Sequence, residues 1–243
     1  MSADTYGELY SAVYARRWDH WSRRLWPFLR TQLDASGIAG GMWLDLCCGT
    51  GSLLRLADDA GFRTIGVDLS PHQLRHAERT APHAQLVRAD IREYRPPAGC
   101  VVVSCLFNGL NYITESAELA TLLQRIAGCL QPRGLLVFDI ETVAGYRQER
   151  STVYRTEDEL VVFDSCYESS SRMHTFQLTG FVRCGAVYRR FDECHVRRAY
   201  LAEEWASLLR QAGLSFRKLD LATLALPGHG AKRLVYVCTT DSH

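Results

Sequence analysis

The sequence lacks an excess of charge of either sign, and it lacks any long apolar run. Its 243 residues include 28 Lys+Arg and 27 Asp+Glu, which gives a formal net charge of +1. Nucleic-acid-binding proteins usually carry a clear basic excess, so this balance argues against a general nucleic-acid binder. The longest apolar stretches span about seven residues and are interrupted by polar positions, too short for a transmembrane helix. We therefore expect no nucleic acid and no membrane among its partners.

The sequence also lacks the cysteine spacings of disulfide-rich and zinc-binding proteins. Nine cysteines is an odd number, and no two of them form a C-x-x-C pair. The opening MSADTYGELY lacks the basic and then apolar order of a secretory signal. Reduced thiols and a cytoplasmic location are the expectation, and no feature points to a particular oligomeric state.

Between residues 41 and 140, the chain has a regular alternation of apolar runs and helical patterns. Its apolar fraction of 47% and charged fraction of 23% are those of an ordinary globular domain. Helical spacing of three and four occurs in 51–61, 71–80 and 115–130. The apolar runs are Met42–Cys47, Thr64–Val67, Gln85–Arg88, Cys100–Cys105 and Gly134–Ile140. Strands that alternate with helices predict a doubly wound, parallel sheet.

Two segments outside this pattern read differently. In residues 1–40, aromatic and leucine side chains recur every three or four positions, which predicts one or two helices with a kink or restart at Pro27. Their rings either pack a cap onto the sheet or close over a ligand. In 142–200, polar and apolar residues alternate as in an antiparallel meander, over Glu159–Cys166, Met173–Arg183 and Ala186–Arg197.

A helix (Ala202–Ala212) and two strands (Leu214–Leu221 and Arg233–Cys238) follow the meander. The chain thus predicts an α/β fold: a Rossmann-like, doubly wound, seven-stranded and mostly parallel sheet with an N-terminal helical lid and an inserted antiparallel β-meander. We expect the lid in 1–40, the core in 41–141, the meander in 142–200 as a substrate cover, and completion of the core in 201–243.

The strongest motif is LDLCCGTG at 44–51, where a predicted strand ends and a helix begins. Gly49 and Gly51 let the backbone turn sharply and approach a ligand, and the following helix offers it unpaired N–H groups. Asp68 lies seventeen residues after Gly51, at the end of the second strand, where a carboxylate can accept two hydrogen bonds from a ribose diol. This order of elements predicts a nucleotide-type site.

The motif favours a cationic ligand over a dinucleotide. The G-x-G-x-x-G fingerprint needs a third glycine where this chain has Leu54, and no P-loop sequence occurs. Asp45, before the glycine turn, suits a ligand with a positive end. S-adenosylmethionine carries an ammonium and a sulfonium, so it fits.

With GVDLS at 66–70 and RADIREY at 88–94, the motif resembles the class I S-adenosylmethionine-dependent methyltransferases. The resemblance extends through CLFNGLNYI (105–113), LLQRIAGCLQPRGLLVFDIET (122–142) and HVRRAYLAEEWASLLRQAGL (195–214). The chain looks like the small-molecule branch, similar to glycine and sugar N-methyltransferases and natural-product tailoring enzymes. This implies an enzyme that moves the methyl group of S-adenosylmethionine to an N or O acceptor on a small molecule in specialised metabolism.

The resemblance also implies which residues hold the cofactor. The methionine part would lie on the turn of Cys47, Cys48, Gly49 and Gly51, with Asp45 as a supporting carboxylate. The remaining positions are Asp68 on the ribose, Leu69 and Ile91 on the two adenine faces, Asp90 on the adenine amine and Cys105 near the sulfonium. Family members often have glycine in place of Cys47, so the first turn is expected to be slightly wider.

Candidate residues for catalysis and acceptor binding come from the lid, the strand ends and the meander. The catalytic candidates are Tyr14, Tyr112, Asp139 and His195, and the acceptor-binding candidates are Phe107, Asn108, Asn111 and Glu141. Tyr14 and Phe107 offer aromatic faces to a sulfonium, and the histidine is suited to accept a proton. Each of these side chains can equally serve only to cap or anchor its own segment.

Several alternatives bear on this reading. Amine methyltransferases of nucleic acid carry an Asn/Asp-Pro-Pro-Tyr/Phe sequence after the fourth strand, and the loop at 107–112 does not. No cluster of His, Asp and Glu has metal-ligand spacing, so we expect no metal. The same fold can also bind the cofactor structurally and catalyse a cyclisation, or act as a non-catalytic binding partner. Formation of S-adenosylhomocysteine distinguishes methyl transfer from both.

Overall fold

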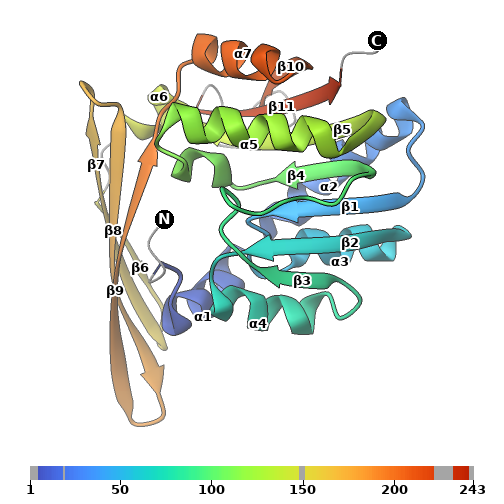
Figure 1. The fold of residues 1–243 in the computed structure, drawn as a ribbon. Coiled ribbons are helices and arrows are strands. Elements are labelled where there is room, and N and C mark those ends of the chain that lie inside the picture. The colour runs from blue at the N-terminus through green and yellow to red at the C-terminus, as the bar shows by residue number, and fades with distance from the viewer. Residues whose placement is uncertain (1–4, 19, 148–150, 222–231, 241–243) are drawn as a thin grey trace.

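A seven-stranded sheet forms the centre of the structure (Figure 1). The computed structural model describes residues 5–18, 20–147, 151–221 and 232–240. The strands are β1 (Gly41–Leu46), β2 (Phe62–Asp68), β3 (Gln85–Arg88), β4 (Cys100–Cys105), β5 (Leu130–Glu141), β10 (Leu214–Asp220) and β11 (Arg233–Thr240). Their order is β10-β11-β5-β4-β1-β2-β3, and β11 pairs antiparallel with β5 and β10 while the other pairs are parallel. The predicted fold class is confirmed.

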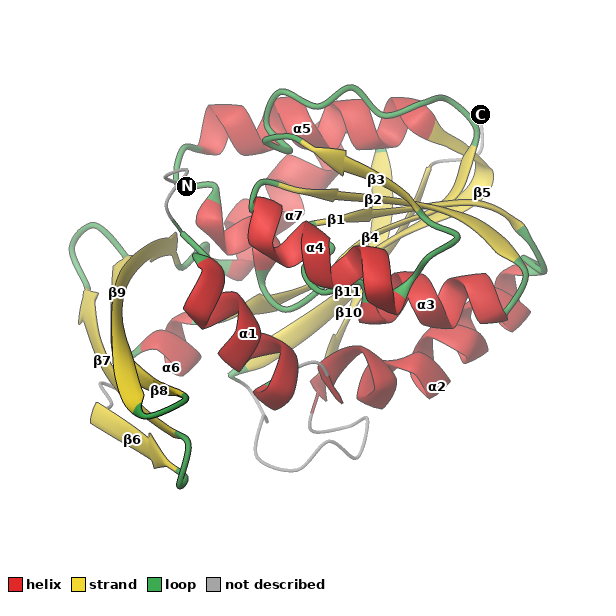
Figure 2. Ribbon diagram, turned by 90° about the horizontal axis from the view of Figure 1, so that it is seen from below, coloured by secondary structure: helices red, strands yellow, loops and turns green. Residues whose placement is uncertain are grey.

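Helices cover both faces of this sheet (Figure 2). Successive side chains of a strand point to opposite faces. Leu44 and Leu46 therefore join the core under α5 (Ser116–Cys129) and α7 (Ala202–Gln211), whereas Trp43 joins the core on the other face. That second face is covered by α2 (His20–Ser36), α3 (Ser52–Asp59) and α4 (Pro71–Thr80). None of the described helices is long and apolar enough to cross a membrane.

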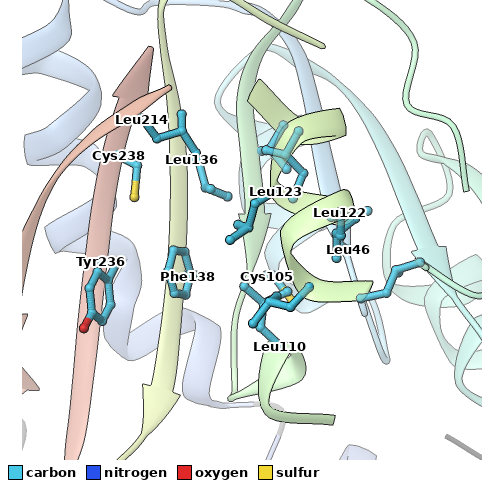
Figure 3. Close-up of a cluster of buried hydrophobic side chains, with 14 of the residues drawn as sticks. Leu46, Cys105, Leu110, Leu122, Leu123, Leu136, Phe138, Leu214, Tyr236 and Cys238 are labelled. Atoms are coloured by element: carbon cyan, nitrogen blue, oxygen red, sulfur yellow. The ribbon is translucent and has the colours of Figure 1, made fainter. Parts of the chain in front are cut away.

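The larger core lies between the sheet and α5 (Figure 3). Leu122 and Leu123 of α5 are fully buried there, and the rings of Phe138 and Tyr236 stack with centroids 5.0 Å apart. Burial of one such apolar side chain stabilises the fold by roughly 1.5–3 kcal/mol. The packed core gives the carboxyl ends of β1, β2, β4 and β5 a rigid base.

A second, antiparallel sheet forms the meander, in the order β6-β7-β8-β9. The strands are β6 (Ser151–Arg155), β7 (Glu159–Glu168), β8 (Met173–Cys184) and β9 (Val187–Arg198). The alternation of residues predicts only the last three, because β6 is short and largely exposed. The short α6 (Val143–Tyr146) leads into this sheet. The sheet packs against α1 (Glu8–Arg17), where Tyr10 and Val13 of the helix contact a cluster of Val161, Phe163 and Leu178.

The N-terminal aromatic stripe divides between two helices with different roles. α1 ends at Arg17, and α2 begins at His20 and runs through Pro27. Of the two predicted alternatives at Pro27, a restart is therefore wrong, and a kink stays a prediction. Burial of Leu25, Leu29 and Leu33 of α2 against the sheet outweighs the cost of a proline inside a helix, about 3 kcal/mol. The α2 rings therefore pack the core, although Trp21 also borders the smaller compartment described below, whereas the rings in and before α1 face the cavities.

Candidate active site

The glycine turn between β1 and α3 forms one wall of the site. Cys47 and Gly49 both have left-handed backbone, with φ 54°, and Gly51 follows with φ 81°. A Cβ on Gly51 would lie 3.0 Å from Cα and Cβ of Ala77 on α4, so the close approach of α4 requires glycine. Cys47 adopts its left-handed conformation with a side chain, at a cost of roughly 1–2 kcal/mol.

Asp68, at the end of β2, is joined to this turn. Its Oδ2 accepts a hydrogen bond from Gly49 N–H at 2.9 Å, and its Oδ1 accepts one from Ser70 N–H at 2.9 Å. Burial raises the pKa of Asp68, against the lowering effect of these backbone hydrogen bonds. Leu69 N–H adds a third backbone hydrogen bond to this carboxylate. A carboxylate has about four lone-pair positions, so one is left for a ligand hydroxyl.

Asp45 of β1 is a buried carboxyl beside the same turn. Its Oδ1 accepts a hydrogen bond from Ser104 Oγ at 2.6 Å, and Ser104 Oγ accepts one from Trp43 Nε1 at 2.8 Å. Burial raises the pKa of Asp45 to about 7 despite the Ser104 hydrogen bond. A cation bound nearby would favour the ionised carboxyl. A carboxyl at this place therefore suits an ammonium better than a phosphate.

A cavity with about 590 Å³ of empty space, part of it open to solvent, adjoins the glycine turn. The predicted residues that line it are Tyr14, Cys47, Gly49, Asp68, Leu69, Asp90, Ile91, Phe107 and Tyr112. A compartment of about 400 Å³ shares part of this lining and adds Asp45 and Cys48. Cys105 is fully buried with its thiol against that of Cys47, and Gly51 shapes the turn without lining either space.

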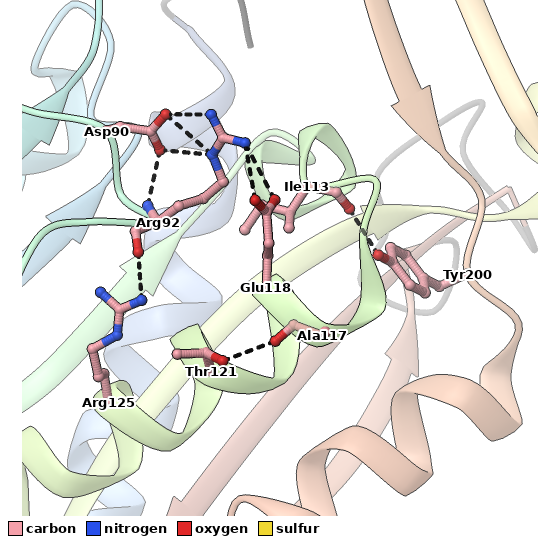
Figure 4. A network of polar contacts seen from close by, with 8 residues as sticks. All are labelled: Asp90, Arg92, Ile113, Ala117, Glu118, Thr121, Arg125 and Tyr200. Atoms are coloured by element: carbon pink, nitrogen blue, oxygen red, sulfur yellow. Dashed lines mark hydrogen bonds and ion pairs between the residues drawn. The ribbon is translucent and has the colours of Figure 1, made fainter.

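Asp90 reaches this cavity with its carboxylate already engaged (Figure 4). Arg92 donates to it from Nη2 at 2.7 Å, from Nε at 3.1 Å to each oxygen, and from its backbone N–H at 2.9 Å. Arg92 Nη1 also contacts Glu118 on α5 at 3.2 Å. Burial raises the pKa of Asp90, but the hydrogen bonds and charge of Arg92 outweigh burial and lower it overall. The sequence reading missed this arginine.

A second cavity of about 980 Å³ lies between α1, the meander and the ends of β4 and β5. Its polar lining comes from Tyr6, Asn108, Tyr112, Glu141, Thr152, Ser165, His174, Arg197 and Arg233, and its apolar lining is largely aromatic. Tyr6, Phe107 and Tyr112 line both this cavity and the first one. The two spaces therefore meet at these three rings.

A chain of four polar side chains begins at this junction. The Tyr6 and Tyr112 hydroxyls lie 3.2 Å apart, and Tyr112 Oη lies 3.0 Å from Nδ1 of His195. Nε2 of His195 lies 2.9 Å from Oε2 of Glu193. A carboxylate only accepts hydrogen bonds, so Nε2 carries the proton and Nδ1 is free to accept one. Burial raises the pKa of both tyrosines, which keeps their hydroxyls protonated.

Tyr6 and Glu193 are functional candidates that the sequence reading did not select. Tyr6 belongs to the aromatic stripe, which gave no reason to prefer it over Tyr14. Glu193 lies two positions before His195 on one strand, and period-two alternation places both on one face. That spacing was an available signal for Glu193. Tyr14 makes edge contacts with Tyr6 and Phe107, at centroid distances of 5.6 and 5.8 Å.

Two of the other predicted residues lie behind the cavity wall. Asp139 is fully buried, accepts a hydrogen bond from Phe107 N–H at 2.5 Å and pairs with Arg233 at 3.4 Å. Asn111, in the 3₁₀ helix η1 (Gly109–Tyr112), is also fully buried and bonds backbone groups of Glu141 and Arg198. These contacts give both side chains a positioning role, so their direct roles in catalysis and acceptor binding stay predictions.

Asn108 and Glu141 do line the second cavity. Asn108 Nδ2 donates to Glu141 Oε2 at 3.3 Å, and Asn108 Oδ1 accepts from Arg233 Nη2 at 3.2 Å. Among the residues that the structure describes, no group of three or more His, Cys, Asp or Glu side chains is placed to hold a metal ion.

Comparison with known proteins decides the family. A solved S-adenosylmethionine-dependent methyltransferase from Clostridium acetobutylicum shares the fold, with a TM-score of 0.85 at 22% identity over 96% of this chain and 98% of that one. A family model described as a methyltransferase domain matches residues 44–134. A putative methyltransferase of Geobacillus sp. (strain WCH70) is 30% identical over 225 residues, or 86% of this chain and 89% of that one. The chain belongs to the S-adenosylmethionine-dependent methyltransferases.

A further member of this methyltransferase family is similar over most of its length. It is the dTDP-3-amino-3,4,6-trideoxy-alpha-D-glucopyranose N,N-dimethyltransferase of Streptomyces venezuelae, 31% identical over 188 residues, or 73% of this chain and 76% of that one. The protein is thus an enzyme whose cofactor is S-adenosylmethionine, as predicted. The glycine turn, the buried Asp45 and the carboxylate of Asp68 in the cavity lining fit that cofactor.

Proposed function

We propose that this methyltransferase moves the methyl group of S-adenosylmethionine to a nitrogen, or an oxygen, of a small molecule in specialised metabolism. The observation that carries the proposal is the meeting of two cavities at Tyr6, Phe107 and Tyr112. In-line displacement needs donor and acceptor held on one axis, and two adjoining cavities that meet at these rings suit that need. Such alignment alone can supply about 7–11 kcal/mol of a barrier.

The Streptomyces relative supports nitrogen as the acceptor atom, because its name describes the dimethylation of an amino sugar. The acceptor cavity is enclosed by side chains of α1 and the meander, which suits a diffusible small molecule better than a polymer. The near-neutral net charge of +1 supports the same choice, with no nucleic acid as substrate. All nine cysteines are free thiols, which is consistent with a reaction in the cytoplasm.

For the cofactor, we place its methionine end against the glycine turn, with the ammonium near Asp45. Asp68 would accept from the ribose hydroxyls, because it lines the same cavity and keeps a lone-pair position beside its backbone hydrogen bonds. The adenine would lie between Leu69 and Ile91, and Asp90, steadied by Arg92, would meet its amine. Tyr14 and Phe107 would face the sulfonium and contribute about 0.5–2 kcal/mol by cation–π attraction.

S-adenosylmethionine, when bound, supplies an activated methyl group on a leaving group that needs no protonation. The protein has only to orient the acceptor, exclude water and take up one proton. α1 and the meander pack together beside the acceptor cavity and would limit the access of water to a bound acceptor. Catalysis in this site therefore depends on enclosure and on a route for the proton.

The four-residue chain supplies that route. The Tyr112 hydroxyl oxygen accepts the proton from the acceptor atom while its own proton passes to Nδ1 of His195. Glu193 stabilises the imidazolium that results, and Tyr112 stays neutral throughout. Tyr6 holds the Tyr112 hydroxyl in place from the lid side. A positioned acid–base group of this kind contributes roughly 10²–10⁴-fold in rate.

The test is incubation with S-adenosylmethionine and a panel of small amines and alcohols, amino sugars included, with S-adenosylhomocysteine measured at each. S-adenosylhomocysteine formed together with a methylated amine supports the proposal. A cyclised product without S-adenosylhomocysteine would establish the cyclase alternative instead. Tight cofactor binding without turnover on any acceptor would favour a non-catalytic binding partner.

A further inference from the structure

Arg197 of β9 carries a buried charge that faces the acceptor cavity without a close anionic partner. Its side chain is 12% exposed, and its ion-pair partner among the described residues, Glu141 Oε2, is 3.9 Å from Nη1. Its Nε is buried and has no hydrogen-bond partner in the described part of the chain. A buried charge with one distant ion-pair partner and an unpartnered N–H keeps much of its desolvation cost, which a closer anion would offset.

Three aromatic rings hold this guanidinium. Its Cζ lies 5.7 Å from the ring centroid of Tyr112 and 5.3 Å from those of Tyr146 and Phe176. Stacking fixes the plane of an arginine and leaves its edge of N–H donors open. Burial lowers the pKa of Arg197, but Tyr146, Tyr112 and Glu141 outweigh burial and raise it overall, so the group stays charged.

The other charged and titratable groups of this wall are already neutralised or occupied. Arg233 pairs with Asp139 and donates to Asn108 at 3.2 Å. Burial and the charge of Arg197 lower the pKa of His174 to about 3, so this imidazole is neutral near pH 7. Glu141 lies between the two arginines, 3.9 Å from Arg197 and 3.8 Å from Arg233. Among the described residues of this wall, Arg197 is thus the cation that lacks a close anionic partner.

We propose that Arg197 binds an anionic oxygen-bearing group of the acceptor, a carboxylate or a phosphoryl group, through the free edge of its guanidinium. Two parallel N–H donors match the oxygens of either group. Tyr112 contacts this guanidinium with its ring and belongs to the proposed proton route, so the anion would be bound beside the place where the acceptor atom is methylated. This inference rests on the proposed function and defines the substrate class for the same cavity.

The experiment measures anion binding to the full-length protein saturated with S-adenosylhomocysteine. Sodium acetate and inorganic phosphate are titrated separately at constant ionic strength, with sodium chloride as the blank, into wild type, Arg197→Gln and Arg197→Lys. The matched control is Arg189→Gln, an exposed arginine on the same strand. We expect saturable binding of at least one anion, weakened about tenfold or more in Arg197→Gln and unchanged in Arg189→Gln.

Lysine keeps the charge but not the paired donors, so Arg197→Lys should bind the anion several-fold more weakly than wild type, which tests the site even if Arg197→Gln does not fold. The stronger of the two anions identifies the group as carboxylate or phosphoryl. Absence of saturable binding by both anions overturns the inference, as does binding that is equal in wild type and Arg197→Lys. Failure of the wild type to bind S-adenosylhomocysteine would instead count against the proposed function.

Discussion

Oε2 of Glu193 accepts a hydrogen bond from the backbone N–H of Tyr6 at 2.8 Å, so a meander strand holds the start of the lid. Oε1 of the same carboxylate accepts one from Gly7 N–H at 2.7 Å, and Oε2 lies 2.9 Å from Nε2 of His195. One side chain therefore fixes the lid and orients the histidine. Closure of the acceptor cavity and the route for the proton depend on the same carboxylate.

Tyr112→Phe removes the hydroxyl that we propose as the link between the acceptor and His195, and keeps the ring in the cavity lining. We expect kcat to fall about 10²-fold or more, because the proton loses its path. Affinity for S-adenosylhomocysteine should stay within a few-fold. Tyr188→Phe, which removes an exposed hydroxyl on β9, is the matched control and should be neutral. Unchanged kcat in Tyr112→Phe would rule out the proton route.

Glu193→Gln keeps the shape of the side chain but turns an amide N–H₂ toward groups that need an acceptor. We expect a loss of about 1–3 kcal/mol in the free energy of unfolding, since a buried donor is left unpaired, together with a lower kcat. Chemical denaturation and steady-state kinetics measure the two effects. Asp192→Asn, next along the strand but half exposed, is the comparison. Equal effects of the two changes would show that the lid does not depend on Glu193.

The cofactor side of the site follows from local sequence because adjacent parallel strands end at one edge of a sheet. Gly49 and Asp68 are only 19 positions apart, and β1 pairs directly with β2, so the contact between them is a consequence of neighbouring strands. The spacing of apolar residues and the position of the glycine turn are local properties of the sequence, and they predict those strands. The same logic accounts for the confirmed fold class and for the cofactor.

The acceptor side depends on docking that no local pattern encodes. Tyr6 and Glu193 are 187 positions apart, and they meet because α1 packs on the meander through aromatic side chains that fit many arrangements. Arg92 is only two positions from Asp90, yet the orientation of its guanidinium toward that carboxylate also depends on the contact with Glu118 of α5. Helix α2 runs through Pro27 for a similar reason, because tertiary burial overrides the local signal.

Asp68→Ala removes the carboxylate that is proposed to accept from the ribose hydroxyls. We expect affinity for S-adenosylhomocysteine to fall by about 1.5–3 kcal/mol, or roughly 10- to 150-fold, as for hydrogen bonds to a charged group. Isothermal titration calorimetry measures it. Asp59→Ala, an exposed acid at the end of α3, should leave the affinity unchanged. An affinity equal to wild type in Asp68→Ala would exclude the ribose assignment.

Gly51→Ala tests the close approach of α4 to the glycine turn. The substitution combines a strained φ of 81° with a Cβ 3.0 Å from Ala77. Gly61→Ala is the matched control, because its φ is 88° and nothing lies within 4 Å of its Cβ position. We expect both to lose about 1–3 kcal/mol of stability from backbone strain, and Gly51→Ala to lose more and also to weaken cofactor binding. Equal losses would mean that the turn adjusts without cost.

The raised pKa of Asp45 makes a prediction about stability and pH. Its pKa rises from an ordinary value of 3.8 to about 7 on folding, so between these values the folded state holds a proton that the unfolded state has lost. The stabilising contribution of the protonated group is therefore complete below pH 4 and decreases as pH rises toward 7. Asp45→Asn mimics the protonated carboxyl at every pH.

The unfolding free energy of wild type minus that of Asp45→Asn should therefore decrease by about 2–3 kcal/mol between pH 5 and pH 8. Urea denaturation at four or five pH values measures the difference, and a flat difference would show that Asp45 titrates normally. Saturating S-adenosylhomocysteine, whose ammonium we place beside this carboxyl, should favour its ionised form and reduce the slope. A slope that the ligand leaves unchanged would remove Asp45 from the ammonium site while leaving its buried titration intact.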